Sequence, residues 1–127
     1  MALGGYAQAL GTVALSLGAH SESTGAYSTA VGGGSHATAQ NAAAIGPWSK
    51  ASAENAVAVG ANAESSGEYA AAIGGDAKAD KTHAIAIGSV AHAQEESSLA
   101  MGNLAKATNT YAYAIGGNAQ AKGRWTI

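Results

Sequence analysis

The sequence predicts an all-β solenoid built from 14-residue coils. Three observations predict it: one glycine recurs at every fourteenth position, small and large apolar residues alternate before that glycine, and Phe is absent. Glycine marks turns and period-two alternation marks strands, so each repeat is expected to contain strands and turns. The recurring glycines are Gly4, Gly18, Gly32, Gly46, Gly60, Gly74, Gly88, Gly102 and Gly116.

The first expected strand of each coil ends at the residue before this glycine. That residue is large and apolar in every coil, and the one before it is always Ala or Ser. The large residues are Leu3, Leu17, Val31, Ile45, Val59, Ile73, Ile87, Met101 and Ile115. In Ala-Ile-Ala-Ile-Gly (84–88) the large residues are two apart, about 200° around a helix but on one face of a strand. This spacing excludes the two-heptad coiled coil that a 14-residue period would also allow.

The second expected strand carries a column of mostly polar residues between two columns of Ala or Ser. Its polar members are Gln8, Glu22, His36, Lys50, Glu64, Lys78, His92, Lys106 and Gln120. A second turn follows, marked by glycine in four coils. Two strands of about five residues and two turns complete each coil, and successive coils should stack in parallel about 4.8 Å apart. Lys50, Glu64 and Lys78 would then be vertical neighbours of alternating charge.

A coil this short is thin, so the side chains between its two sheets must be small. The Ala and Ser columns, including Ala56, Ala58 and Ser65, are therefore expected inside and the large column outside. The outer face also carries Leu15, Val57, Ile85 and Leu99. Such a stripe exceeds what a soluble monomer exposes, which predicts self-association through this face. The alternative is a wider, monomeric coil with the large residues inside, but it leaves the Ala and Ser restriction unexplained.

The composition excludes several function classes. Six Lys and Arg with a net charge of −2 provide no basic patch for nucleic acid. The four His do not converge and Cys is absent, so we expect neither a metal nor another cofactor. No catalytic constellation recurs, and a solid interior offers no cleft, so the chain is not expected to be an enzyme. Without an apolar run of about 20 residues or a signal peptide, any membrane attachment would require an anchor outside this fragment.

Two segments carry a resemblance to a known family. Asn41-Ala-Ala-Ala-Ile-Gly46 and Asn55-Ala-Val-Ala-Val-Gly60 resemble the Asn-Ser-Val-Ala-Ile-Gly motif of YadA-type heads in trimeric autotransporter adhesins. The resemblance covers residues 1–127 as one head fragment of about nine repeats, without stalk or anchor. It implies a left-handed parallel β-roll and a homotrimer, with the large residues from Leu17 to Ile115 as its core. Other coils replace the motif's Asn, as in Val13, so a continuous Asn ladder is not expected.

The resemblance also implies a function and a location. The chain would be an adhesin head on the surface of a Gram-negative bacterium, exported to the outer membrane, and would bind a host extracellular matrix protein or cell-surface receptor. The alternative is a passive spacer that displays a distal binding domain. Candidate residues of the outer adhesive face are His36, Trp48, Lys50, Glu64, Lys78, His92 and Lys106. Trp48 follows Pro47 in a turn and is expected to be exposed, whereas Trp125 is expected to cap the last coil.

Overall fold

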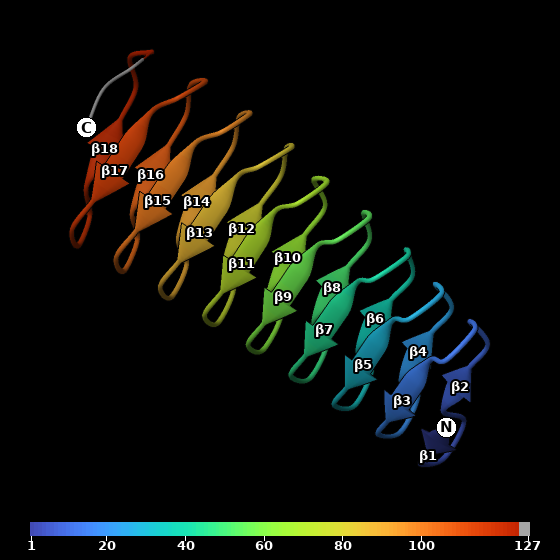
Figure 1. Ribbon diagram of the computed structural model, residues 1–127. Helices are drawn as coiled ribbons and strands as arrows, with labels where there is room; N and C mark the ends of the chain where they lie inside the picture. Colours follow the sequence, from blue (N-terminus) through green and yellow to red (C-terminus); the bar gives the residue numbers. More distant parts are fainter. Residues whose placement is uncertain (125–127) are drawn as a thin grey trace.

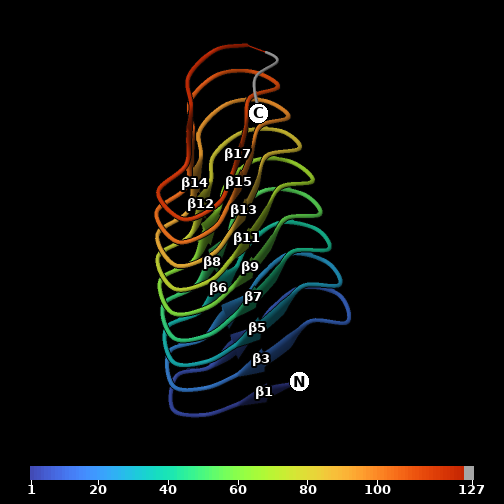
Figure 2. The same cartoon turned by 90° about the vertical axis from the view of Figure 1, so that its left-hand side faces the viewer.

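The computed structural model describes residues 1–124 and shows an all-β parallel solenoid. The chain alternates between two sheets of nine strands each, one in the order β1-β3-β5-β7-β9-β11-β13-β15-β17 and the other from β2 to β18. Each coil advances along one axis, so the termini lie at opposite ends of the stack (Figure 1), and the coils lie one above another when the molecule is turned (Figure 2). The predicted solenoid of 14-residue coils is confirmed.

The strands are shorter than predicted. The first sheet contains β1 (Ala2–Leu3), β3 (Leu15–Leu17), β5 (Thr29–Val31), β7 (Ala43–Ile45), β9 (Val57–Val59), β11 (Ala71–Ile73), β13 (Ile85–Ile87), β15 (Leu99–Met101) and β17 (Tyr113–Ile115). The second sheet contains β2 (Gln8–Ala9), β4 (Glu22–Ser23), β6 (His36–Ala37), β8 (Lys50–Ala51), β10 (Glu64–Ser65), β12 (Lys78–Ala79), β14 (His92–Ala93), β16 (Lys106–Ala107) and β18 (Gln120–Ala121). The predicted strand length was wrong because the two turns take up a larger share of each coil.

Every strand pairs with the equivalent strand of the next coil. Glu64 pairs in register with both Lys50 and Lys78, as predicted. The backbone ladder continues through the turns, where the Asn62 N–H donates to the Pro47 carbonyl at 3.0 Å. Main-chain hydrogen bonds therefore run along the axis around the whole coil. In the described part of the chain, no helix is long and apolar enough to cross a membrane.

The interior contains only small residues. Among residues 1–124, the buried ones are Ala, Ser and Gly; Ala58 and Ser65, for example, have no exposed surface. The core serines satisfy their hydroxyl groups locally, as Ser65 Oγ donates to the Ala70 carbonyl at 2.9 Å. Within the described residues no buried side-chain polar atom lacks a partner. The Ala and Ser columns are therefore inside as predicted, and the wider coil is wrong.

The recurring glycine begins the first turn of each coil, and no other residue fits there. Gly60 has a φ of 130°, which L side chains rarely adopt. A Cβ on Gly60 would also lie 2.6 Å from the carbonyl carbon and oxygen of Gly74 in the next coil. The glycine thus permits both the bend and the close stacking of successive turns.

The third residue of each turn adopts the left-handed conformation. In the first turn, Ala63 N–H donates to the Gly60 carbonyl at 3.2 Å and Asn62 has a φ of 59°. In the second turn, Ala70 N–H donates to the Gly67 carbonyl at 3.1 Å and Tyr69 also has a φ of 59°. A positive φ at the third position is typical of a type II turn. These left-handed positions recur at every seventh position along the chain.

Candidate functional site

The large residues form a continuous outward stripe on the first sheet. This apolar stripe comprises Leu17, Val31, Ile45, Val59, Ile73, Ile87, Met101 and Ile115, together with Leu15, Val57, Ile85 and Leu99. Its members are half-buried or exposed in the single chain: Ile45 is 41% exposed and Ile115 54%. In-register pairing makes the stripe continuous, since Ile73 pairs with Val59 and Ile87. The outward direction predicted for these residues is confirmed.

Nothing charged interrupts the apolar stripe. Along the described strands β3 to β17, its two columns contain aliphatic residues, Met101, Tyr113, Thr29 and two alanines. The N–H and C=O groups beneath it are used in the ladder, so the surface offers side-chain contacts only. A large apolar face of this kind on a soluble protein is typical of an interaction surface.

The second sheet presents the opposite chemistry. Its polar column, defined by His36, Lys50, Glu64, Lys78, His92 and Lys106, faces outward from strands β6 to β16. The three lysines are exposed, and the two histidines and Glu64 are half-buried. The two faces of one thin coil are thus chemically distinct.

On the polar face, two histidines lie against carboxylates. Within residues 1–124, the pairs closer than 4.0 Å are His36 with Glu22 at 3.6 Å and His92 with Asp80 at 2.6 Å. Gln94 Nε2 lies 3.0 Å from His92 Nδ1, which fits an imidazole that accepts at Nδ1 and donates from Nε2 to Asp80. The predicted column of alternating charge exists in register, but Glu64 forms no such pair with either neighbouring lysine.

Trp48 lies at the edge between the polar face and the first turn. Its φ is 62°, the residue is exposed as predicted, with 63% of its surface accessible, and Pro47 precedes it at the second position of the turn. Its indole covers Gly34 in the preceding coil, because a Cβ on Gly34 would lie 2.5 Å from Trp48 Cε3. Shallow depressions lie on both sides of this indole, one lined by Lys50 and Lys78 and another by Glu22 and His36.

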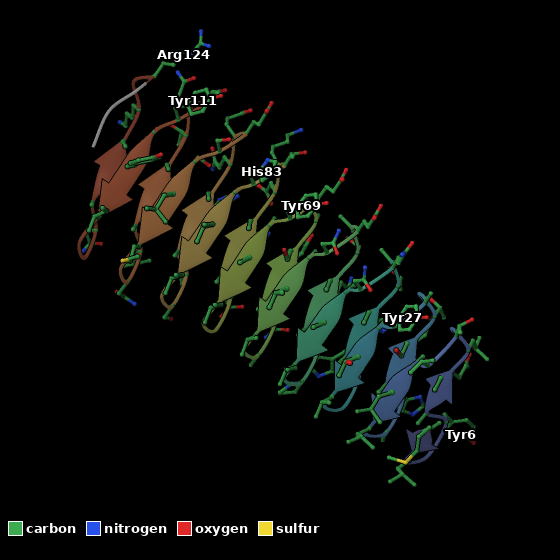
Figure 3. The ribbon with its side chains drawn as sticks, in the orientation of Figure 1. Tyr6, Tyr27, Tyr69, His83, Tyr111 and Arg124 are labelled. Carbon is green, nitrogen blue, oxygen red and sulfur yellow. The ribbon has the colours of Figure 1, made fainter. Side chains whose placement is uncertain are left out.

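The histidines are distributed over separate parts of the surface. His20 stacks on Tyr6 at one edge with ring centroids 5.0 Å apart, and His83 stacks on Tyr69 at 5.3 Å. Figure 3 shows Tyr69 and His83 on one edge and Tyr6 near the opposite edge. In the described part of the chain, no three His, Asp or Glu side chains lie where they could share a metal ion. Trp125, expected to cap the last coil, lies outside the described residues.

The left-handed backbone positions are the structural feature that sequence reasoning missed. Asn41 and Asn55, which carry the family motif, have φ values of 58° and 60°, and Asn41 Nδ2 donates to Asn55 Oδ1 at 3.1 Å. Asn tolerates this conformation better than most residues. The motif's Asn therefore marks a backbone requirement, which Val13 also meets, with a φ of 54°. The seven-residue spacing of Asn55 and Asn62 was the available signal.

Comparisons with known proteins agree with this geometry. The model of the family described as YadA head domain repeat (2 copies) matches residues 9–35, 23–46, 37–63, 65–91, 93–119 and 107–124. Among solved structures, the collagen-binding domain of the Yersinia adhesin YadA is similar in fold, with a TM-score of 0.61 and 24% sequence identity. The alignment covers 91% of this chain and 57% of that one. A search of curated protein sequences gave no significant match.

Proposed function

Because the chain belongs to the YadA head domain repeat family, we propose that it is the adhesive head of a trimeric protein on the surface of a Gram-negative bacterium. Three copies pack around one axis through the apolar stripe, and the polar faces point outward. An anchor elsewhere in the full protein holds the head at the outer membrane. The head itself acts without catalysis, as expected of an adhesin of this family.

The continuous apolar stripe is the observation that carries the proposal. Full burial of one large aliphatic side chain contributes about 1.5–3 kcal/mol, but residues such as Ile73 are only 40% exposed in the single chain. Burying what remains along the whole stripe therefore contributes on the order of 10 kcal/mol per chain before the cost of association. This free energy is smaller than it would be if the side chains were fully exposed before assembly, but it is enough to favour assembly.

The mass of the protein in solution tests the assembly. We expect a trimer in sedimentation equilibrium, and Ile73→Glu should dissociate it by placing a charge in the packed core. Ser52→Glu is the matched control, since Ser52 is exposed beside the polar column and the same substitution there should leave the mass unchanged. A wild-type protein that stays monomeric and folded at high concentration would overturn the proposal.

The partner proposed for the outer face is a matrix protein or a cell-surface receptor of the host. The similar Yersinia domain is described as collagen-binding, which makes collagen the first matrix protein to test. A repeated face also converts weak contacts into avidity without a deep pocket. We propose that the polar column and Trp48 supply these contacts.

Binding to immobilised matrix proteins separates adhesion from the second candidate, a passive spacer. Saturable binding of the trimer to collagen, fibronectin or laminin, weakened at least tenfold by replacing Lys50, Lys78 and Lys106 with Ala, would support adhesion. An intact trimer that binds none of the three would support the spacer. The triple variant should keep the wild-type mass, because it alters only the face opposite the apolar stripe.

A further inference from the structure

Gly34 and Pro47 hold the exposed Trp48 side chain flat on the surface. A Cβ on Gly34 would lie 2.5, 2.6 and 2.9 Å from three adjoining atoms of the six-membered ring, so the ring covers Gly34 with its face. Pro47 restricts the backbone just before the indole. Gly34 is the one glycine at this turn position within residues 1–124, and the indole buries it. The arrangement is a rigid aromatic platform with most of its surface still open.

The solenoid does not need an aromatic residue at this position. Asn62 and Asn118 occupy the equivalent position in other coils with φ values of 59° and 61°, close to the 62° of Trp48. An amide side chain therefore satisfies the same turn, and exposing an indole there gives the single chain no packing in the core. The platform is thus a feature that folding alone does not explain.

A hollow of about 340 Å³ lies beside the platform. Trp48 lines it toward one end, the stacked Tyr6 and His20 rings line it toward the other, and Gly34 is part of its lining. Glu22 and His36 also line it, and their side chains lie 3.6 Å apart. Aromatic ends combined with a carboxylate and an imidazole offer an apolar surface together with a hydrogen-bond acceptor and donor.

We propose that this hollow binds a neutral pyranose sugar at the end of a host glycan. The C–H face of the ring would lie against the indole, while its hydroxyl groups donate to Glu22 and accept from His36. The carboxylate of Glu22 disfavours sialylated and sulfated sugars through like-charge repulsion. A peptide could not form main-chain hydrogen bonds with these N–H groups, because those of Glu22 and His36 already donate to the carbonyl oxygens of Ser35 and Ser49.

The inference rests on the proposed trimer in one respect: the hollow must stay accessible when the apolar stripe is buried. Glu22 and His36 belong to β4 and β6 of the second sheet, whereas the stripe lies on the first. Each trimer would carry three equivalent hollows, so weak single-site binding would be measured most readily as avidity on a dense sugar surface.

Surface plasmon resonance with albumin carrying terminal β-galactose or N-acetylglucosamine tests the site. Wild-type trimer is expected to bind at least one conjugate, and α2,3-sialylated galactose should bind at least tenfold more weakly. Trp48→Asn should reduce binding at least tenfold and keep the fold, because Asn occupies this turn position elsewhere. Gly34→Ala should reduce binding as well, by lifting the indole from the backbone. Tyr27→Asn is the control, since it removes an exposed aromatic residue from the opposite edge (Figure 3).

Binding to neither conjugate, or equal binding by wild type and Trp48→Asn, would overturn the inference. A Trp48-dependent interaction with a triple-helical Pro-Hyp-Gly peptide but not with sugars would assign the hollow to a peptide and overturn it as well. The solution mass of each variant shows whether it is still a trimer, so loss of sugar binding can be distinguished from loss of assembly. A trimer that binds matrix protein but no sugar leaves the proposed function intact.

Discussion

The two turns of each coil share a left-handed third residue but differ in their first. The first turn begins with glycine in all nine coils, whereas the second begins with Gly, Ala, Lys, Glu or Asn. Gly60 of the first turn has a φ of 130°, while Ala53 and Lys81 of the second are not among the residues with positive φ. Sequence restriction at this position therefore follows backbone conformation, because a Cβ would approach the next coil's main chain in both turns but only the first turn requires a positive φ.

The largest expected effect comes from comparing two single variants that each add a methyl group to the first residue of a turn, one in the first turn and one in the second. Gly60→Ala adds backbone strain of about 1–3 kcal/mol and a collision with the Gly74 main chain, so we expect a loss of several kcal/mol. Gly67→Ala also meets a carbonyl, that of Lys81, but coils that begin this turn with Ala show that the stack can adjust. Its expected cost is about 1 kcal/mol. Urea unfolding of both variants measures the difference, and equal losses would contradict the comparison.

A smaller effect is expected at the third turn residue, where the two turns should behave alike. Val13 in the second turn and Val90 in the first have φ values of 54° and 60°, which β-branched residues rarely adopt. Val13→Asn and Val90→Asn should each stabilise the protein by about 1 kcal/mol. Asn62→Val, the reverse change, should cost a similar amount. Thermal unfolding at fixed protein concentration gives these values, and stabilisation in only one turn would show that their conformations differ.

The smallest expected effect concerns proline at the second turn residue. Pro47 already occupies this position in the first turn, and replacing it with Ala should cost about 0.4–1 kcal/mol by freeing the unfolded chain. If the second turn has the same geometry, Glu68→Pro should stabilise the protein by a similar amount. Unfolding curves of the two variants, compared with Glu68→Ala as the control, measure the change. If Glu68→Pro destabilises the protein, the two turns share the conformation of their third residue but not that of their second.

The fold could be predicted from the sequence because its determinants repeat in register. A glycine that recurs with Ile73 and Ala72 before it gives the period, the strand and the inward face from residue types alone. Strand length was overestimated because residues as different as Asn62 and Tyr69 share the left-handed turn conformation. The seven-residue spacing of Asn55 and Asn62 was the one signal of it, and the remaining residue types at these positions do not reveal it. Backbone hydrogen bonds between coils hold that conformation, and such bonds do not restrict side-chain identity.

The candidate site was harder to predict because it depends on side-chain direction. The exposure of Trp48 follows from its place in a turn, but its contact with Gly34 requires the indole to lean toward the preceding coil. Comparing equivalent positions of successive coils would have shown a glycine beneath a tryptophan. His92 pairs with Asp80, which lies in a different column and in the preceding coil. No linear spacing in the sequence indicates this pairing.

The hydrogen bonds that run along the axis have a mechanical consequence. A pull between the two ends of a single chain loads the ladder of one terminal coil first, so that coil would peel away before its neighbours feel a comparable strain. Each step would release the slack of a single repeat and expose only methyl and hydroxymethyl groups from the interior. Extension would therefore proceed in small, equal increments, and the chain could lengthen under load while most of its coils stayed folded.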